Sequence, residues 1–170
     1  MMNDELLDLV NDNDIVIGCA FRSDVYANKK NNFRVVNLFI ENSAGQLWIP
    51  RRSAVKKIYP LGLDASMGGH VACGETYTQA LARELKEELN IDLTMVAYHF
   101  LGHLTPHQHE TSAFMQVFKI FQDTAPHFNS NDFVEYYWLS PQELLARLNN
   151  GDTAKSDLPK LIQHFYSMRL

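Results

Sequence analysis

Apolar residues recur along the chain with two periods, one typical of strands and the other typical of helices. Short apolar or alternating runs predict strands at residues 6–10, 15–21, 33–41, 46–50, 64–71, 95–104, 112–121 and 133–139. Apolar residues at every third or fourth position predict helices at residues 77–89, 141–148 and 158–168. This order predicts an α/β protein, and no internal repeat is present.

Turn residues support this division of the chain. Asn11–Asp14 and Asn42–Gly45 each join two neighbouring strands, and both segments have the Asn/Asp-rich composition of hairpin turns. A third connection, Thr105–Thr111, is polar and rich in histidine. It is expected to be a loop between the strands at residues 95–104 and 112–121.

The helix at residues 77–89 has clear signals at both ends. Thr76 and Gln79 form a capping box at its start. Asn90 can adopt the left-handed conformation that ends a helix. The stripe expected to be buried consists of Tyr77, Leu81, Leu85 and Leu89.

Three glutamates lie on one face of this helix. Glu84, Glu87 and Glu88 stand at positions i, i+3 and i+4, so their carboxylates repel one another. Glu87 and Glu88 also fall in the last turn, where the backbone carbonyls already make the field negative. A hard divalent cation such as Mg²⁺ or Mn²⁺ removes both penalties because it takes oxygen ligands. A solvated acidic face is the alternative interpretation of the triplet alone.

The residues around these glutamates favour the metal site. Gly68 and Gly69 allow the backbone to approach an ion closely. Gly74 and Glu75 add a turn with a fourth acid. Arg83 can hold a carboxylate through two hydrogen bonds. The segment therefore indicates divalent-metal chemistry on a diphosphate.

The segment Gly69–Ile91 resembles the Nudix box, in which a glycine, four acids and an arginine recur at fixed spacing. The one departure is Asn90 in place of a glycine, and asparagine also adopts the left-handed helix end. The resemblance implies an α/β/α sandwich with a mixed, mostly antiparallel sheet and an enzyme that hydrolyses diphosphate linkages. The matching residues are Gly69, Glu75, Arg83, Glu84, Leu85, Glu87, Glu88 and Ile91.

The resemblance also implies a role for each polar residue of the box. Arg83 would orient a ligand carboxylate, and Glu75 would hold the loop or a water molecule. The general base would be Glu84 or Glu88, followed by Glu110 and Glu135 near the ends of later strands. The implied metal ligands are the Gly69 carbonyl and the carboxylates of Glu84, Glu87 and Glu88.

The residues flanking the box resemble the Nudix branch that includes isopentenyl-diphosphate isomerase. Those isomerases carry a reactive cysteine directly before the box glycine, where this chain has Gly68, and Cys73 does not match that position. They also carry a metal-binding histidine before an arginine, where Phe33 precedes Arg34. His70 alone fits their histidine set and is expected to support the site. These departures favour hydrolysis over isomerisation.

Two groups of polar residues outside the box remain to be placed. Arg51, Arg52 and Lys57, with Lys56 beside them, could supply counter-charge to a diphosphate; a solvated loop is the alternative. A zinc site among the later histidines is disfavoured because no cysteine joins them and their spacing fits no common closed site. Those histidines are His99, His103, His107 and His109.

Length and composition predict one domain, with residues 1–32 as a hairpin and lead-in, 33–150 as the core and 151–170 as a C-terminal helix. A net charge of -5 without a long basic run argues against duplex nucleic acid as a partner. The chain has neither a signal-peptide pattern nor an apolar run long enough for a membrane span, so we expect a cytoplasmic protein. Cys19 and Cys73 are expected to be free thiols, with one bridge as the alternative.

The sequence thus predicts a Mg²⁺- or Mn²⁺-dependent hydrolase that cleaves a diphosphate linkage in a nucleoside diphosphate derivative or a similar small molecule. A homodimer is compatible with this prediction. The alternatives are an isopentenyl-diphosphate isomerase-like enzyme and a non-catalytic nucleotide-binding Nudix module. The box does not specify the substrate, because specificity comes from loops and strand faces outside it.

Overall fold

The computed structural model describes residues 4–169 of the chain, so the outermost residues of the predicted domain, 1–3 and 170, lie outside it. The strands are β1 (Leu6–Val10), β2 (Val16–Phe21), β3 (Arg34–Glu41), β4 (Leu47–Arg52), β5 (Met67–His70), β6 (Tyr98–Leu104), β7 (Phe114–Phe121) and β8 (Phe133–Leu139). The helices are α1 (Arg22–Ala27), α2 (Tyr77–Leu89), α3 (Pro106–His109), α4 (Pro141–Asn149) and α5 (Leu158–Tyr166), with 3₁₀ turns η1 (Leu93–Met95) and η2 (Ser167–Arg169).

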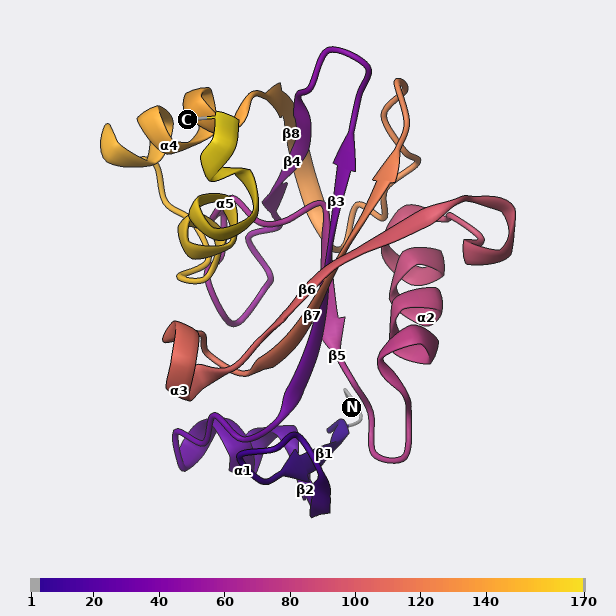
Figure 1. Cartoon of the computed structure of the whole chain (residues 1–170), viewed down its shortest axis with the longest axis vertical. Coiled ribbons are helices and arrows are strands. Elements are labelled where there is room, and N and C mark those ends of the chain that lie inside the picture. The colour runs from indigo at the N-terminus through magenta and orange to yellow at the C-terminus, as the bar shows by residue number, and fades with distance from the viewer. Residues whose placement is uncertain (1–3, 170) are drawn as a thin grey trace.

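A mixed sheet forms the middle of the molecule. Its strands run in the order β6-β7-β3-β4-β8, and β5 pairs with β3 beside this path. The β3–β7 pair is parallel, whereas the other pairs of this sheet are antiparallel. Helix α2 covers one face, and α4 and α5 lie on the other (Figure 1). The predicted α/β/α sandwich with a mostly antiparallel sheet is confirmed.

Strand β3 connects the cores on the two sides of the sheet, because successive side chains of a strand point to opposite faces. Val36, Leu38 and Ile40 pack with the apolar stripe of α2. Phe39, from the other face, packs with residues of α4 and α5 such as Leu144 and Leu161. The sandwich therefore buries apolar residues on both faces of the sheet, and β5 and α2 are fixed to one of them.

The predicted N-terminal hairpin is present and pairs with the box loop. Strands β1 and β2 form a two-stranded antiparallel sheet. Leu7 forms an isolated bridge with Ala72, and the Cys73 amide donates to the Leu6 carbonyl. Figure 1 shows this hairpin and α1 at the bottom of the molecule, beside the end of β5. Helix α1 was not predicted, since six residues are too few to establish a helical period.

The expectation of two free thiols is wrong. Cys19 and Cys73 form a disulfide, with their Cα atoms 6.0 Å apart. The bridge follows from strand pairing: β1 lies between β2, which carries Cys19, and the loop that carries Cys73. A separation of 54 residues gives no indication of this proximity in the sequence.

Other predicted boundaries need small corrections. The histidine-rich connection contains the short helix α3, with Pro106 at its first turn, where proline is tolerated. Strand β5 starts at Met67 rather than at residue 64, and α5 ends at Tyr166 and continues as η2. None of the described helices is both long and apolar enough to cross a membrane.

Candidate metal and substrate site

Helix α2 has the predicted ends and the predicted buried face. Thr76 and Gln79 form the capping box, and Asn90 ends the helix with φ 53° and ψ 32°. The predicted stripe of Tyr77, Leu81, Leu85 and Leu89 is buried. Because this stripe faces the sheet, it turns Glu84 and Glu88 toward β5, and both are also buried.

Gly69 of β5 lies directly against Glu84. A Cβ atom on Gly69 would stand 2.0 Å from the Glu84 Cδ atom, so any side chain here would displace the Glu84 carboxylate. Gly69 also pairs with Val36 of β3, so the strand cannot move away without losing sheet hydrogen bonds. Glycine is therefore required for the carboxylate to approach the backbone of β5.

Arg83 holds the acids of the box together. Its Nε and Nη2 atoms donate to the two oxygens of Glu75, both at 2.9 Å. Its Nη1 atom donates to Glu84 Oε1 at 2.7 Å and to Glu87 Oε2 at 3.5 Å. Nη2 also donates to the His70 carbonyl at 2.9 Å, which ties the helix to β5. Arg83 therefore contacts three of the four box acids, and Glu75 accepts two of its hydrogen bonds.

Burial makes the two inner carboxylates reluctant to ionise without a cation. Burial raises the pKa of Glu84 to about 7, although the neighbouring Arg83 opposes the shift. Burial also raises the pKa of Glu88 well above its usual value, and the Glu84 charge adds to the effect. Gly68 N lies 3.4 Å from Glu88 Oε2, at the long end of hydrogen-bond distances. A buried pair of this kind fits a divalent cation, which would compensate both charges.

The third glutamate differs from the other two. The Glu87 side chain is 59% exposed. Among residues 4–169, the box acids do not form a group of three with ligand atoms all within 4.8 Å of one another. Glu87 can approach a cation beside Glu84 and Glu88 by a change of side-chain rotamer, since its contact to Arg83 is long and exposed.

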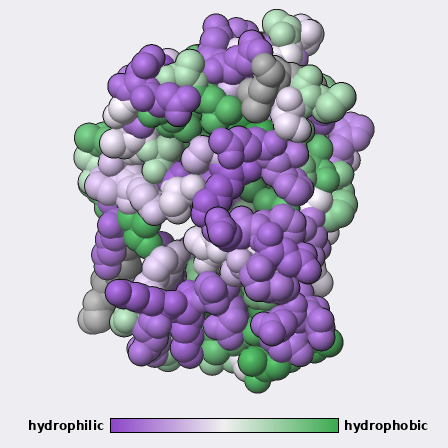
Figure 2. Space-filling model, turned by 60° about the vertical axis from the view of Figure 1, so that its left-hand side comes forward, coloured by the Kyte–Doolittle hydropathy of each residue, from purple (hydrophilic) through white to green (hydrophobic). Residues whose placement is uncertain are grey.

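Three of the box acids line a cavity of about 1120 Å³ between the sheet and the N-terminal segment. One wall carries Gly68, Gly69, Glu84, Glu87 and Glu88. Figure 2 shows a hollow between the lower part of the molecule, where Figure 1 places the hairpin and α1, and the body above it, bordered by both hydrophilic and hydrophobic residues. A cavity of this size can hold a nucleotide-sized ligand.

His70 belongs to the wall of this cavity but is engaged by neighbouring side chains. Its ring stacks on Phe33, with centroids 5.7 Å apart, and its Nε2 atom lies 3.0 Å from the Tyr26 hydroxyl. Burial, reinforced by nearby cations such as Arg22, lowers the pKa of His70 to about 3. His70 is therefore neutral and packed into the cavity wall, and its role in supporting the site stays a prediction.

The expected phosphate-binding residues separate into two sets. Arg52 and Lys57 line the cavity together with Lys56, whereas Arg51 does not. The guanidinium of Arg51 binds Asp152 through two hydrogen bonds of 2.9 Å and Glu135 at 2.6 Å. The phosphate-binding role expected for Arg51 therefore disagrees with its position, which is that of a structural ion pair.

This difference gives a test. Arg51→Ala should leave KM unchanged and lower the free energy of unfolding by about 1–3 kcal/mol, because Asp152 loses two charge-assisted hydrogen bonds. Arg52→Ala, in the cavity wall, should raise KM. Urea unfolding and steady-state kinetics of the two variants measure both effects. An increase in KM for Arg51→Ala equal to that for Arg52→Ala would contradict the assignment.

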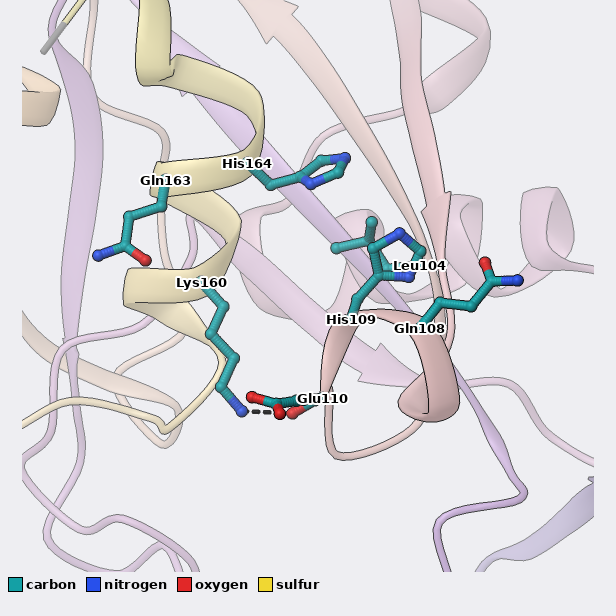
Figure 3. A pocket seen from close by; sticks show the side chains of 7 residues that line it. All are labelled: Leu104, Gln108, His109, Glu110, Lys160, Gln163 and His164. Atoms are coloured by element: carbon teal, nitrogen blue, oxygen red, sulfur yellow. Dashed lines mark hydrogen bonds between the residues drawn. The ribbon is translucent and has the colours of Figure 1, made fainter.

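The two additional acids lie outside the cavity of the box. Glu135 is exposed, and its Oε1 atom accepts hydrogen bonds from Arg51 and Tyr137. Glu110 lines a smaller pocket of about 420 Å³ with Lys160, His109 and His164 (Figure 3). Neither position supports the role of extra ligand or base. Within the described chain, the later histidines form no group with metal-ligand geometry.

The sequence did not indicate several residues of the cavity. Tyr26 and Arg22 come from the unpredicted helix α1, and Lys155 comes from the polar segment between α4 and α5. Asp64 precedes β5 and binds Arg52 at 2.7 Å. These residues belong to no motif, so the fold alone brings them together.

Comparison with known proteins identifies the family. The NUDIX domain description matches residues 31–161, which include the whole box. The chain belongs to the Nudix family. An uncharacterized Nudix hydrolase of Nostoc sp. is 58% identical over 98% of this chain and 99% of its own length. A crystal structure of DR0079 from Deinococcus radiodurans has a TM-score of 0.90 and 45% identity, covering 95% of this chain and 99% of that chain.

This Nudix protein is accordingly a hydrolase of the pyrophosphohydrolase type, which acts on acid anhydrides and, in this family, generally uses divalent metals. The chain is also similar, at lower sequence identity, to proteins of the isomerase branch. An isopentenyl-diphosphate Delta-isomerase of Kocuria rhizophila is 27% identical over 82% of this chain and 79% of its own length. The Nudix box of this chain thus lies in the structural context that the family requires, a strand, a loop and a helix.

Proposed function

We propose that this protein hydrolyses a diphosphate linkage in a nucleoside diphosphate derivative or a similar small molecule, with Mg²⁺ or Mn²⁺ as cofactor. The main support is the buried pair Glu84 and Glu88, which opens into a cavity that basic residues also line. Buried acids without a cation are costly, so their retention at this position favours a metal-binding role. We further propose that the enzyme acts in the cytoplasm and that duplex nucleic acid and membranes are not its partners.

In this reaction, residues of the box would bind the metal and activate the attacking water. Glu84, Glu87, Glu88 and the Gly69 carbonyl would hold the metal, and Arg83 keeps Glu84 in place through the 2.7 Å hydrogen bond. A bound divalent cation would neutralise phosphate charge and lower the pKa of the attacking water. Glu84 or Glu88 would accept the proton of that water, since each is buried at the wall of the cavity.

Two features of the structure argue against the alternative of isomerase chemistry. A side chain at position 68, where the isomerases carry cysteine, would begin 2.7 Å from Asn37 Oδ1. Phe33, at the position of their histidine, stacks on His70 and offers no metal ligand. Product analysis with isopentenyl diphosphate distinguishes the two reactions, because isomerisation releases no phosphate.

The third class, a non-catalytic nucleotide-binding module, is disfavoured by the four retained acids of the box. A panel of nucleoside diphosphate derivatives, dinucleotides, nucleotide sugars and prenyl diphosphates, assayed with Mg²⁺ or Mn²⁺ for released phosphate or monophosphate, tests the proposal. We expect metal-dependent release from at least one class, abolished by EDTA. Tight nucleotide binding without release from any class would contradict hydrolysis.

A further inference from the structure

Lys155 is held at the cavity by the backbone of the segment between α4 and α5. Its amide donates to the Leu63 carbonyl at 2.9 Å, and the Leu63 amide donates to the Thr153 carbonyl at 2.8 Å. Ala154 and Leu63 form a parallel bridge between these two bonds. The position of Lys155 is therefore fixed by the strand-like pairing of its segment, not by a flexible loop.

The ammonium group of Lys155 lies near the metal-binding wall. Its Nζ atom is 3.6 Å from the position that a Cβ atom on Gly68 would take. Gly68 directly precedes Gly69, and its amide faces Glu88 at 3.4 Å. Gly68 thus lies between the Lys155 ammonium and the buried carboxylates, with Asn37 Oδ1 beside it.

Lys155 forms a long ion pair with a carboxylate that also binds a second cation. Its nearest acid is Asp64, whose Oδ1 atom lies 3.6 Å from Nζ. Asp64 already binds Arg52 Nη1 at 2.7 Å, so one buried carboxylate faces two cations. Lys155 therefore shares its acidic partner with Arg52, and its side chain is 30% exposed at the cavity.

The other basic residues of the cavity are less suited to bind an anion at this position. Lys56 forms an ion pair with Asp132. Arg52 is committed to Asp64 and to the Ile58 carbonyl at 3.1 Å. Lys57 is exposed, so solvent and salt would screen its charge.

We propose that Lys155 binds the phosphate oxygens of the substrate beside the carboxylate wall, a role that rests on the proposed diphosphate hydrolysis. The substrate would then span Gly68, with one phosphate at the cation held by the box acids and the neighbouring phosphate oxygens on the Lys155 ammonium. An ammonium group is a compact point charge that suits phosphate oxygens in several orientations. Lys155 thus supplies the counter-charge that the sequence suggested for Arg51.

The test compares Lys155→Met with Lys155→Arg, and Lys160→Met is the matched control. Lys160 lies in α5 and lines the smaller pocket, outside the cavity of the box. Methylenediphosphonate, a diphosphate analogue that cannot be hydrolysed, is titrated by calorimetry in the presence of Mg²⁺. Binding of Mn²⁺ alone is followed by electron paramagnetic resonance, and thermal unfolding reports the integrity of each variant.

We expect Lys155→Met to weaken diphosphonate binding by about 10-fold or more, because a charge-assisted hydrogen bond is lost. Lys155→Arg and Lys160→Met should bind within about threefold of the wild type. Mn²⁺ affinity should be unchanged, and the binding of Lys155→Met should depend less steeply on salt than that of the wild type.

Equal diphosphonate affinity in Lys155→Met and the wild type would overturn the proposal. A parallel loss of Mn²⁺ affinity would also overturn it, because Lys155 would then act on the metal site. These outcomes differ from failure of the proposed function, in which the wild type itself would cleave no substrate of the panel.

Discussion

Replacing Glu88 by glutamine should remove most metal-dependent turnover, by about 10²–10⁴-fold, and should make the metal-free protein more stable. Glutamine keeps the shape of the side chain and can still accept the hydrogen bond from Gly68, but it carries no charge to bind a cation. The stability gain follows from burial, which makes the ionised carboxylate costly when no metal is present. Activity assays and thermal unfolding in EDTA measure the two effects.

The stability gain should depend on pH in a defined direction. The pKa of Glu84, about 7, and that of Glu88 both lie above the ordinary glutamate pKa of roughly 4.3 in the folded protein. The folded state therefore holds protons that the unfolded chain has lost, so stability without metal falls as pH rises from about 4.3 to about 7 and beyond. Glu88→Gln should show a shallower fall.

Glu87→Gln is the matched control for this experiment. Its side chain is 59% exposed, so neutralising it should reduce turnover with a smaller gain in metal-free stability than Glu88→Gln gives. Full activity of either variant would exclude that glutamate from metal binding. A Glu88→Gln protein with the same pH dependence of unfolding as the wild type would show that Glu88 is not a buried ionisable group.

Reduction of the Cys19–Cys73 disulfide should lower the free energy of unfolding by roughly 2–4 kcal/mol. The bridge closes a loop across a separation of 54 residues, so it restricts the unfolded chain strongly. For a chain of this length, that loss corresponds to a fall in Tm of about 5–15 °C. Thermal unfolding with and without dithiothreitol measures it.

The double variant Cys19→Ser/Cys73→Ser provides the control, because dithiothreitol should then have no effect on its Tm. Neither cysteine occupies the position of the isomerase thiol, so this variant should keep its kcat at temperatures below its unfolding transition. The disulfide assignment is refuted if the oxidised wild type titrates with two free thiols. Loss of kcat in the folded double variant would instead indicate a thiol-dependent reaction.

Local signals explain which parts of the site were predictable. The capping box, the stripe of α2 and the left-handed Asn90 depend on residues within a few positions of one another, and all three are confirmed. Strand pairing depends on residues far apart, so the sequence could not indicate that β1 would bring Cys19 to Cys73. Helix α1 is too short to give a period, and its contribution to the cavity was missed for this reason.

Arg51 and Arg52 show a second limit of sequence reasoning. Their adjacency suggested a shared role in phosphate binding. Both lie at the end of β4, where consecutive side chains point to opposite faces of the sheet. Arg52 accordingly lies at the cavity with Asp64, and Arg51 binds Asp152 on the other side. Lys155, more than a hundred residues further along the chain, takes the neighbouring position because of a backbone bridge to Leu63.

Part of the cavity wall comes from the N-terminal segment, which precedes the residues that match the family. The family match begins at residue 31, yet Glu5, Arg22 and Tyr26 line the cavity from earlier in the chain. The acids of the box and part of the cavity wall therefore come from different stretches of the sequence. Substitutions or exchanges confined to the first thirty residues can alter which molecules enter the cavity while every acid of the box stays in place. The same segment is bonded to the loop of the box through the Cys19–Cys73 disulfide, so its exchange would also act on that loop.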